Sequence, residues 1–211
     1  MNLWLEKKLW HSGYDTVIGI DEVGRGSLAG PLVLCGVMIR QCDLPQLKKI
    51  KGVNDSKKLA PAAREEIFSH VKQFGIPYVI QRITPRMIDA KNIYRAAIMG
   101  CNGITKKCER VVPASSRFVV CDGGLFVPRM PSAFQETFIK GDARVFSIAL
   151  ASIVAKQVRD ALMVRFSKIY PIYGWDKNKG YGTKAHRDAL QAHGVTPFHR
   201  VTFTTACTKP L

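Results

Sequence analysis

Four acidic residues stand where the predicted strands and helices of this chain begin or end. Asp21 and Glu22 follow a short apolar segment, and Asp122 follows another. Asp142 comes just before the segment with the clearest helical pattern. Because the ends of neighbouring elements meet at one edge of a sheet, the four carboxylates are candidates for one shared site.

Each of these carboxylates also has a purely structural interpretation. Acidic residues are common in turns, Asp-Gly is a frequent turn pair, and Asp142 is equally well explained as an N-cap that accepts a backbone N–H group. Adjacent strand residues such as Asp21 and Glu22 point to opposite faces. A turn at the glycine that follows would bring both carboxylates to one site.

The charge of the whole chain favours a functional interpretation of the four carboxylates. The chain has 32 Lys and Arg against 16 Asp and Glu, a net charge of +16. Residues 1–142 and 143–211 contribute equally to this excess, which favours a polyanionic partner such as nucleic acid. Carboxylates are ligands of Mg²⁺ and Mn²⁺, and two such ions promote phosphodiester hydrolysis by activating water and stabilising the leaving oxygen. A basic surface around an acidic centre therefore predicts a metal-dependent nuclease.

The glycine-rich loop after the first two carboxylates is a candidate for contact with a sugar. Gly24 and Gly26 lack side chains, so the backbone on both sides of Arg25 can approach a ligand closely. Backbone N–H and C=O groups there are suited to a ribose 2′-hydroxyl, which separates RNA from DNA. A plain tight turn is the alternative.

Two segments further along combine cations with turn residues. Residues 55–58 predict a helix N-terminus beside Lys57, a favourable place for a phosphate, with an ordinary N-cap as the alternative. Residues 177–184 interleave cations, glycines and Tyr181, which suits contact with a nucleic-acid backbone and stacking.

Composition excludes several other classes of protein. Hydrophobic residues make up 46% and charged residues 23% of the chain, as in ordinary globular proteins. No apolar stretch approaches the roughly 18 residues of a membrane span, and the first residues do not resemble a secretory signal. We therefore expect a cytoplasmic protein without membrane association. The six cysteines include no CxxC pair and are expected to be reduced, and the histidines have no metal-ligand spacing.

The order of apolar patterns predicts the α/β fold class. The segment 17–39 is expected to form two antiparallel strands joined by the glycine-rich loop. Further strands are expected at 77–83 and 117–121, and helices at 57–74, 86–108, 143–166 and 184–193. This order predicts a central mixed β-sheet flanked by helices in a single domain, 1–211, with a C-terminal helical extension at about 165–211.

Six motifs, in one order, carry a resemblance to a known family. They are GIDEVGRGSLAGPLV, NDSKKL, VCDGG, KGDARVFSIALASIVAKQVRD, NKGYGTKAHRDAL and TPFHRVTF. Together they span about residues 17 to 203 and resemble bacterial ribonuclease HII, the type 2 ribonuclease H. The resemblance implies an RNase H-like fold and cleavage of the RNA strand of RNA–DNA hybrids, leaving 5′-phosphate and 3′-hydroxyl ends. It also implies incision 5′ to single ribonucleotides embedded in duplex DNA.

The resemblance assigns a role to each candidate carboxylate. Asp21, Glu22, Asp122 and Asp142 match the family's metal-binding residues, which implies two Mg²⁺ or Mn²⁺ ions with substrate bound and weak occupancy without it.

The resemblance also assigns substrate-binding roles. It implies 2′-hydroxyl reading by the loop and stacking of Tyr181 on the sugar beside the RNA–DNA junction. Three further residues fall in motifs near the substrate backbone. The matching substrate-binding positions are Gly24, Arg25, Gly26, Lys57, Ser152, Lys156 and Tyr181. Without the resemblance, a salt bridge to Asp160 is the default interpretation of Lys156.

The sequence departs from the family pattern at three places without losing a carboxylate. Ser27 stands where the family usually has proline, Val23 where it usually has alanine, and Gly124 where asparagine is commoner. Ribonuclease HIII usually has Gly-Lys-Gly in the loop and an additional N-terminal domain. The Gly-Arg-Gly loop and the short segment before the first strand therefore favour type HII.

The expected partners are RNA–DNA hybrids and ribonucleotide-containing duplex DNA, bound by a monomer. The sequence makes no prediction about recruitment by a sliding clamp or RNA polymerase, because TTACTKPL contains no clear clamp-binding motif. Two alternatives remain. A DNA-directed nuclease such as a junction resolvase is disfavoured by the loop and Tyr181. A non-catalytic nucleic-acid-binding protein would bind without regard to metal.

Overall fold

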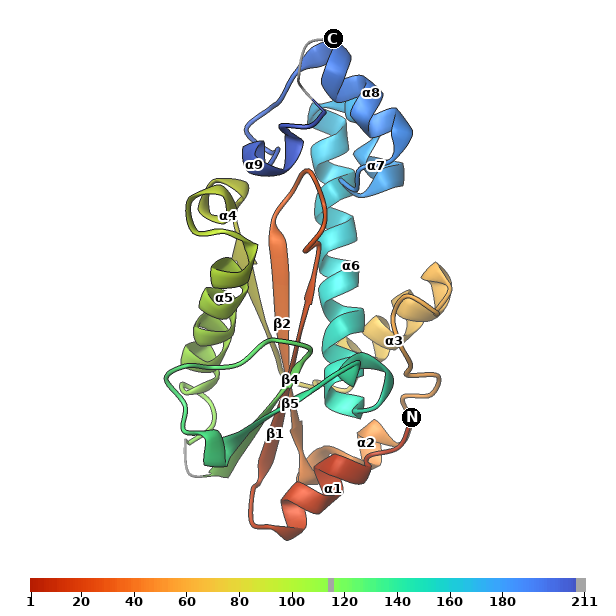
Figure 1. Cartoon of the computed structure of the whole chain (residues 1–211). Coiled ribbons are helices and arrows are strands. Elements are labelled where there is room, and N and C mark those ends of the chain that lie inside the picture. The colour runs from red at the N-terminus through yellow and green to blue at the C-terminus, as the bar shows by residue number, and fades with distance from the viewer. Residues whose placement is uncertain (114–115, 208–211) are drawn as a thin grey trace.

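The computed structural model describes residues 1–113 and 116–207, and its centre is a five-stranded sheet (Figure 1). The strands lie in the order β3-β2-β1-β4-β5. Their bounds are β1 Thr16–Val23, β2 Leu32–Arg40, β3 Tyr78–Ile83, β4 Arg117–Asp122 and β5 Gln135–Phe138. β2 is antiparallel to β1 and β3, whereas β4 is parallel to β1 and β5. The predicted mixed sheet is confirmed.

β5 is the strand that the sequence did not predict. It has only four residues, QETF, and a single buried side chain, that of Phe138. A short edge strand with one apolar position lacks the alternation from which strands are recognised.

Helices cover both faces of the sheet (Figure 1). The α-helices are α1 Trp4–His11, α2 Leu44–Leu47, α3 Pro61–Gln73, α4 Pro85–Lys91, α5 Ile93–Cys108, α6 Phe146–Ile169, α7 Trp175–Asn178, α8 Lys184–His193 and α9 Val201–Thr204. The 3₁₀-helices are η1 Gln41–Asp43, η3 Ser132–Phe134, η4 Gly141–Ala143 and η5 Pro171–Tyr173. Successive strand residues belong to opposite layers: Val17 packs in the core with α6 and α3, and Ile18 in the core with α4 and α5.

Three helix predictions need correction at their boundaries. The helix predicted at 143–166 runs from Phe146 to Ile169 instead, because residues 141–143 form η4. The helix predicted at 57–74 begins at Pro61, because residues 56–58 form a turn and residue 59 a bend instead. The helix predicted at 86–108 is two helices, since Asn92 has a φ of 62° and separates α4 from α5. The Asn92 side chain then caps α5 by accepting a hydrogen bond from the Arg95 N–H at 3.0 Å.

α6 lies directly against β1, and a glycine makes this possible. A Cβ at Gly19 would lie 2.2 Å from the backbone carbon of Ser147, which no side chain can do. The first ten residues of α6 are all buried, and many of them are small. This close packing brings the carboxyl end of β1 next to the N-terminal end of α6.

The predicted C-terminal helical region is present, and η5, α7, α8 and α9 follow α6 there (Figure 1). Its core contains Trp175, His186 and His199, all buried. His186 Nε2 accepts a hydrogen bond from Trp175 Nε1 and lies 3.1 Å from His199 Nε2. The two histidines therefore serve packing. Residues 208–211 of the predicted extension lie outside the described residues.

The described part of the chain contains no helix long and apolar enough to cross a membrane. All six cysteines have free thiols, as the sequence predicts for reduced residues.

The histidine pair predicts a loss of stability in acid. Burial and then the neighbouring His186 lower the pKa of His199 to about 4, whereas an unfolded histidine has a pKa of about 6.5. The folded state thus binds fewer protons, so its stability should fall as the pH drops from about 6.5 through about 4. His199→Gln should flatten this part of the profile. Denaturant unfolding of both proteins at pH 7, 5.5 and 4 checks it, and parallel profiles would contradict it.

Candidate active site

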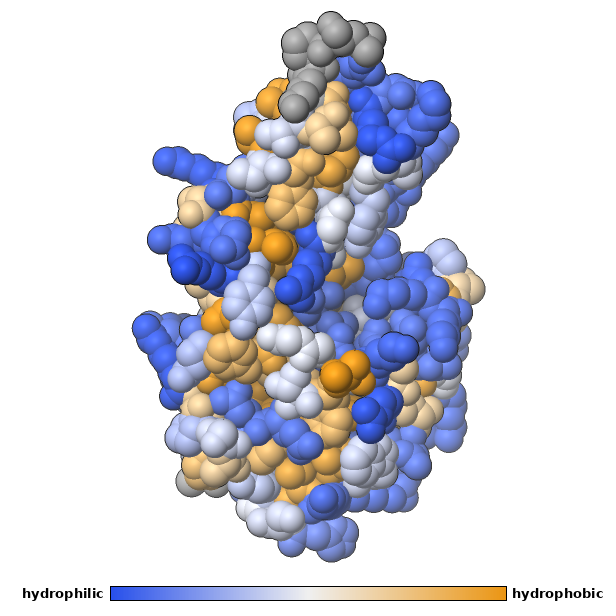
Figure 2. Space-filling view, viewed as in Figure 1, coloured by the Kyte–Doolittle hydropathy of each residue, from blue (hydrophilic) through white to orange (hydrophobic). Residues whose placement is uncertain are grey.

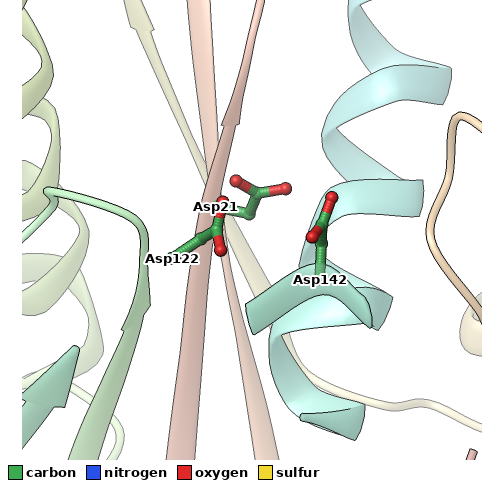
Figure 3. Close-up of side chains that lie close together, drawn as sticks. All are labelled: Asp21, Asp122 and Asp142. Atoms are coloured by element: carbon green, nitrogen blue, oxygen red, sulfur yellow. The ribbon is translucent and has the colours of Figure 1, made fainter. Parts of the chain in front are cut away.

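Three of the four candidate carboxylates lie close together where β4 ends beside β1 (Figure 3). Asp21, Asp122 and Asp142 each offer an oxygen within 4.8 Å of the other two. Asp21 and Asp142 are buried, and Asp122 is partly buried. Three carboxylates at this separation can share a cation.

Strand pairing and a tight turn produce the cluster. β1 and β4 are parallel, and Ile20 pairs with Cys121. The residues that follow, Asp21 and Asp122, are therefore neighbours on adjacent strands. Asp142 arrives from the other side, in η4 just before α6. The Gly141 N–H donates to Asp122 Oδ1 at 2.6 Å and ties η4 to β4. The N-cap of α6 is Val145, so the N-cap interpretation of Asp142 is wrong.

Glu22 lies beside the cluster but not in it. β1 continues to Val23, so the backbone does not turn after Asp21 as expected, and the two side chains leave opposite faces of the strand. Glu22 Oε1 accepts from Arg25 Nη1 at 3.2 Å. Its other oxygen, Oε2, is buried and has no hydrogen-bond partner among residues 1–113 and 116–207. Glu22 thus has a free carboxylate oxygen, and its carboxylate is close enough to Asp122 for their charges to interact.

The pKa values of these carboxyl groups are raised mainly by burial and further by repulsion between the carboxylates. Burial, followed by the charge of Glu22, raises the pKa of Asp21 well above its usual value. Burial likewise raises the pKa of Asp122, and the Asp142 carboxylate adds to it. Lys57 Nζ lies 3.3 Å from Asp142 Oδ2, but this lysine side chain is 82% exposed. A divalent cation would offset the repulsion far better, so the residues fit a metal ion.

The predicted recognition loop has one constrained glycine and one open glycine. Gly24 has a φ of 89°, and a Cβ there would lie 2.1 Å from Arg159 Nε. At Gly26, by contrast, a Cβ would meet nothing within 4 Å. The backbone N–H groups of Arg25 and Gly26 donate to no acceptor in the described ranges 1–113 and 116–207. Two open donors therefore follow Glu22 closely along the chain.

Tyr181 lies close to this loop because the two segments are hydrogen-bonded. The Leu28 N–H donates to the Gly180 carbonyl at 2.8 Å. The Tyr181 ring is partly exposed, with the Arg159 guanidinium carbon 5.4 Å and Lys156 Nζ 6.0 Å from its centroid. An aromatic face is thus available beside the loop.

The other predicted backbone contacts differ in accessibility. Ser152 is buried, its hydroxyl lies 2.9 Å from that of Ser56, and it partly offsets the raised pKa of Asp21. Lys156 forms the expected salt bridge with Asp160 at 3.0 Å. No helix begins at residues 55–58, so the predicted helix N-terminus for a phosphate is wrong there. The Lys57 N–H instead donates to Asp55 Oδ1 within the turn.

Two buried arginines that hold the loop were missed at the sequence level. Arg159 and Arg200 are fully buried. Their only sequence signal is a cation within the KQVRD and TPFHRVTF motifs, and long cations are rarely buried.

Figure 2 shows the surface hollowed beside α6, between α7 and α3, with hydrophilic residues around the hollow.

Comparison with known families gives a match over most of the chain. The family model for Ribonuclease HII matches residues 18–206. The chain belongs to the ribonuclease HII family. It is therefore a metal-dependent endoribonuclease of the ribonuclease H type, which cleaves the RNA strand of RNA–DNA hybrids. The predicted family is confirmed.

Relatives in two bacteria cover nearly the whole chain. Ribonuclease HII of Desulfitobacterium hafniense is 42% identical over 94% of this chain and 72% of the relative. The Chlorobium luteolum protein of the same name is 37% identical, over 94% of this chain and 92% of its own.

Solved structures agree with the predicted RNase H-like fold. Ribonuclease H2 of Pyrococcus horikoshii is 26% identical, with a TM-score of 0.68 over 92% of this chain and all of that one. Ribonuclease HII of Archaeoglobus fulgidus, solved with PCNA, is 27% identical, with a TM-score of 0.64 over 88% of this chain and 93% of that one. Bst-RNase HIII in complex with Mn²⁺ has a TM-score of 0.74 at 20% identity, over 94% of this chain and 71% of that one, and supports the fold alone.

Proposed function

We propose that this enzyme also incises duplex DNA on the 5′ side of a single embedded ribonucleotide. The observation that carries the proposal is the pair of open backbone donors, at Arg25 and Gly26, next to the carboxylate cluster and Tyr181. A recognition element beside the cleavage centre places the cut next to the 2′-hydroxyl that it reads.

Asp21, Asp122 and Asp142, together with the free oxygen of Glu22, would hold two Mg²⁺ or Mn²⁺ ions. When bound, such ions activate water and stabilise the leaving oxygen of a phosphodiester. The protein groups keep the carboxylates apart and oriented: the Gly141 N–H holds Asp122, and the Glu22 N–H donates to Asp21 Oδ1 at 2.7 Å.

The basic and aromatic residues would bind the rest of the substrate. The backbone donors of the Gly24-Arg25-Gly26 loop bind the 2′-hydroxyl, and the Tyr181 ring stacks on the adjoining sugar. Lys57 and Lys156 hold the phosphate backbone. Ser152, which is buried, acts through Asp21 instead of touching the substrate.

We further infer that residues 1–211 form one catalytic unit, in which the helical region from about 165 onward grips the duplex. All proposed site residues come from one chain, which supports action as a monomer on RNA–DNA hybrids and ribonucleotide-containing duplexes.

A set of matched duplexes tests this function. Each carries deoxyribose, ribose or 2′-fluoro-2′-deoxyribose at one position, and incision is measured with Mg²⁺ and with Mn²⁺. We expect a single cut 5′ to the ribonucleotide. The other duplexes should react about 10⁴-fold more slowly, as at sites built to bind a hydroxyl. Equal cutting of the deoxyribose duplex would contradict the proposal and favour a DNA-directed nuclease.

A further inference from the structure

The buried guanidinium of Arg159, on α6, is bonded to two separate segments of the proposed recognition site. On the loop side, Nε donates to the Pro31 carbonyl at 3.1 Å, and Nη2 donates to Ser27 Oγ at 2.7 Å and to the Ala29 carbonyl at 3.0 Å. On the other side, Nη1 donates to the Lys179 carbonyl at 2.8 Å. One planar group thus links the loop to the segment of chain that carries Tyr181.

This arginine is not held by charge pairing. Within the described part of the chain it forms no salt bridge with a carboxylate, and the partners named above are neutral oxygens. Burial of a cation without a counter-ion is costly. The rigid fork of the arginine side chain, which directs donors at fixed angles, is what the site uses.

Ser27 extends this contact to the glycine that begins the loop. Its side chain is fully buried, and its hydroxyl donates to the Gly24 carbonyl at 2.9 Å while it accepts from Arg159. Gly24 also packs against the guanidinium, which leaves no space for a Cβ there. The position of the loop backbone is therefore set on two sides by Arg159, once directly and once through Ser27.

The same guanidinium also underlies the aromatic ring. Its central carbon lies 5.4 Å from the centroid of Tyr181. The carbonyl of Lys179 that it binds belongs to a residue with a φ of 51°, and Gly180 follows with a φ of 81°. Such left-handed conformations need support from their surroundings, and Arg159 provides one hydrogen bond of that support.

We propose that Arg159 and Ser27 are positioning residues that set the spacing between the Arg25-Gly26 donors and the Tyr181 ring, and so the preference for ribose over deoxyribose. The proposal rests on the proposed function, because it assigns the precision of that recognition to two residues that do not touch the substrate. It also assigns a positioning role to Ser27, where the sequence departs from the family pattern.

Other contacts keep the loop attached when the contacts from Arg159 through Ser27 to Gly24 are weakened. Arg200 donates from Nε and Nη2 to the Gly30 carbonyl and from Nη1 to the Arg25 carbonyl at 2.9 Å. Removing the Ser27 hydroxyl therefore removes one of the two contacts that position Gly24, without detaching the loop. This separates an effect on recognition from an effect on folding.

The experiment compares Ser27→Ala with wild type and with Ser147→Ala. Ser147 is a matched control, because it is a fully buried serine whose hydroxyl has no partner in the described residues. The affinity of each protein is measured in EDTA for a duplex with one ribonucleotide and for the all-DNA duplex. The ratio of the two dissociation constants is the ribose preference, and thermal unfolding in the same buffer reports folding.

We expect Ser27→Ala to lower the ribose preference about tenfold, the size of a lost hydrogen bond to a charged group, with all-DNA affinity changed less than about twofold. Arg159→Lys, which keeps the charge but loses the fork, should lower the preference at least as much. Ser147→Ala should keep the wild-type ratio. A folded Ser27→Ala or Arg159→Lys protein with the wild-type ratio overturns the inference. A wild-type protein without any preference overturns the proposed function itself, and the inference with it.

Discussion

Asp122→Asn is expected to lower the cleavage rate more than about 100-fold, because even the outer hydrogen-bond partners of metal ligands cost about 10- to 100-fold when they are lost. The change removes one charge from the cluster but retains the shape of the side chain. The asparagine carbonyl can still accept the 2.6 Å hydrogen bond from the Gly141 N–H. The turn that carries Asp142 should therefore stay in place, and the loss should come from weaker metal binding.

Binding and cleavage should separate in this variant. In EDTA, where no metal ion participates, Asp122→Asn should bind the ribonucleotide duplex at least as well as wild type, since one negative charge near the phosphates is gone. Asp15→Asn is the matched control, because Asp15 is an exposed carboxylate just before the opposite end of β1. Single-turnover cleavage and filter binding measure the two properties. Cleavage by Asp122→Asn at the wild-type rate would show that this carboxylate holds no metal ion.

Asp21→Asn is expected to inactivate the enzyme and at the same time to stabilise its metal-free form at neutral pH. Asp21 is buried, and burial and the Glu22 carboxylate raise its pKa well above the usual value. A carboxyl group whose pKa is raised by folding supports the folded state while it is protonated, and that support is lost as the pH rises through the folded-state pKa. The metal-free wild type should therefore be weakened at neutral pH by a charge that the variant lacks.

The pH dependence gives this prediction its sign. Below about pH 3, Asp21 is protonated in the folded state and, with an unfolded pKa of about 3.9, largely protonated in the unfolded state as well. The two proteins should then differ little. As the pH rises to 8, the free energy of unfolding of Asp21→Asn should exceed that of wild type by a growing margin in EDTA. Mg²⁺ should reduce the margin by stabilising only the protein that binds it. Urea unfolding with and without Mg²⁺ measures the effect, and a margin that shrinks with rising pH would refute it.

Much of the fold was predictable because it depends on local patterns. The strands at β1, β2, β3 and β4 and the long helix α6 have clear apolar patterns, and the structure confirms each of them. The elements that were missed or misplaced depend on context. β5 has one buried residue and pairs with the edge of β4, and the break between α4 and α5 lies at Asn92, which has a positive φ.

The sequence by itself determined which chemistry the site can perform, starting from Asp21 and Glu22 and the Gly-Arg-Gly loop beside them. Residue type and strand ends are local properties, so the carboxylates, the glycines of the loop and the basic character could all be recognised. Only the tertiary structure decided how these residues share space. The parallel pairing of β1 with β4 joined Asp21 to Asp122, whereas the strand alternation left Glu22 at the side. A buried arginine on α6 connects the loop to Tyr181, because contacts between segments far apart in sequence form only when the chain packs.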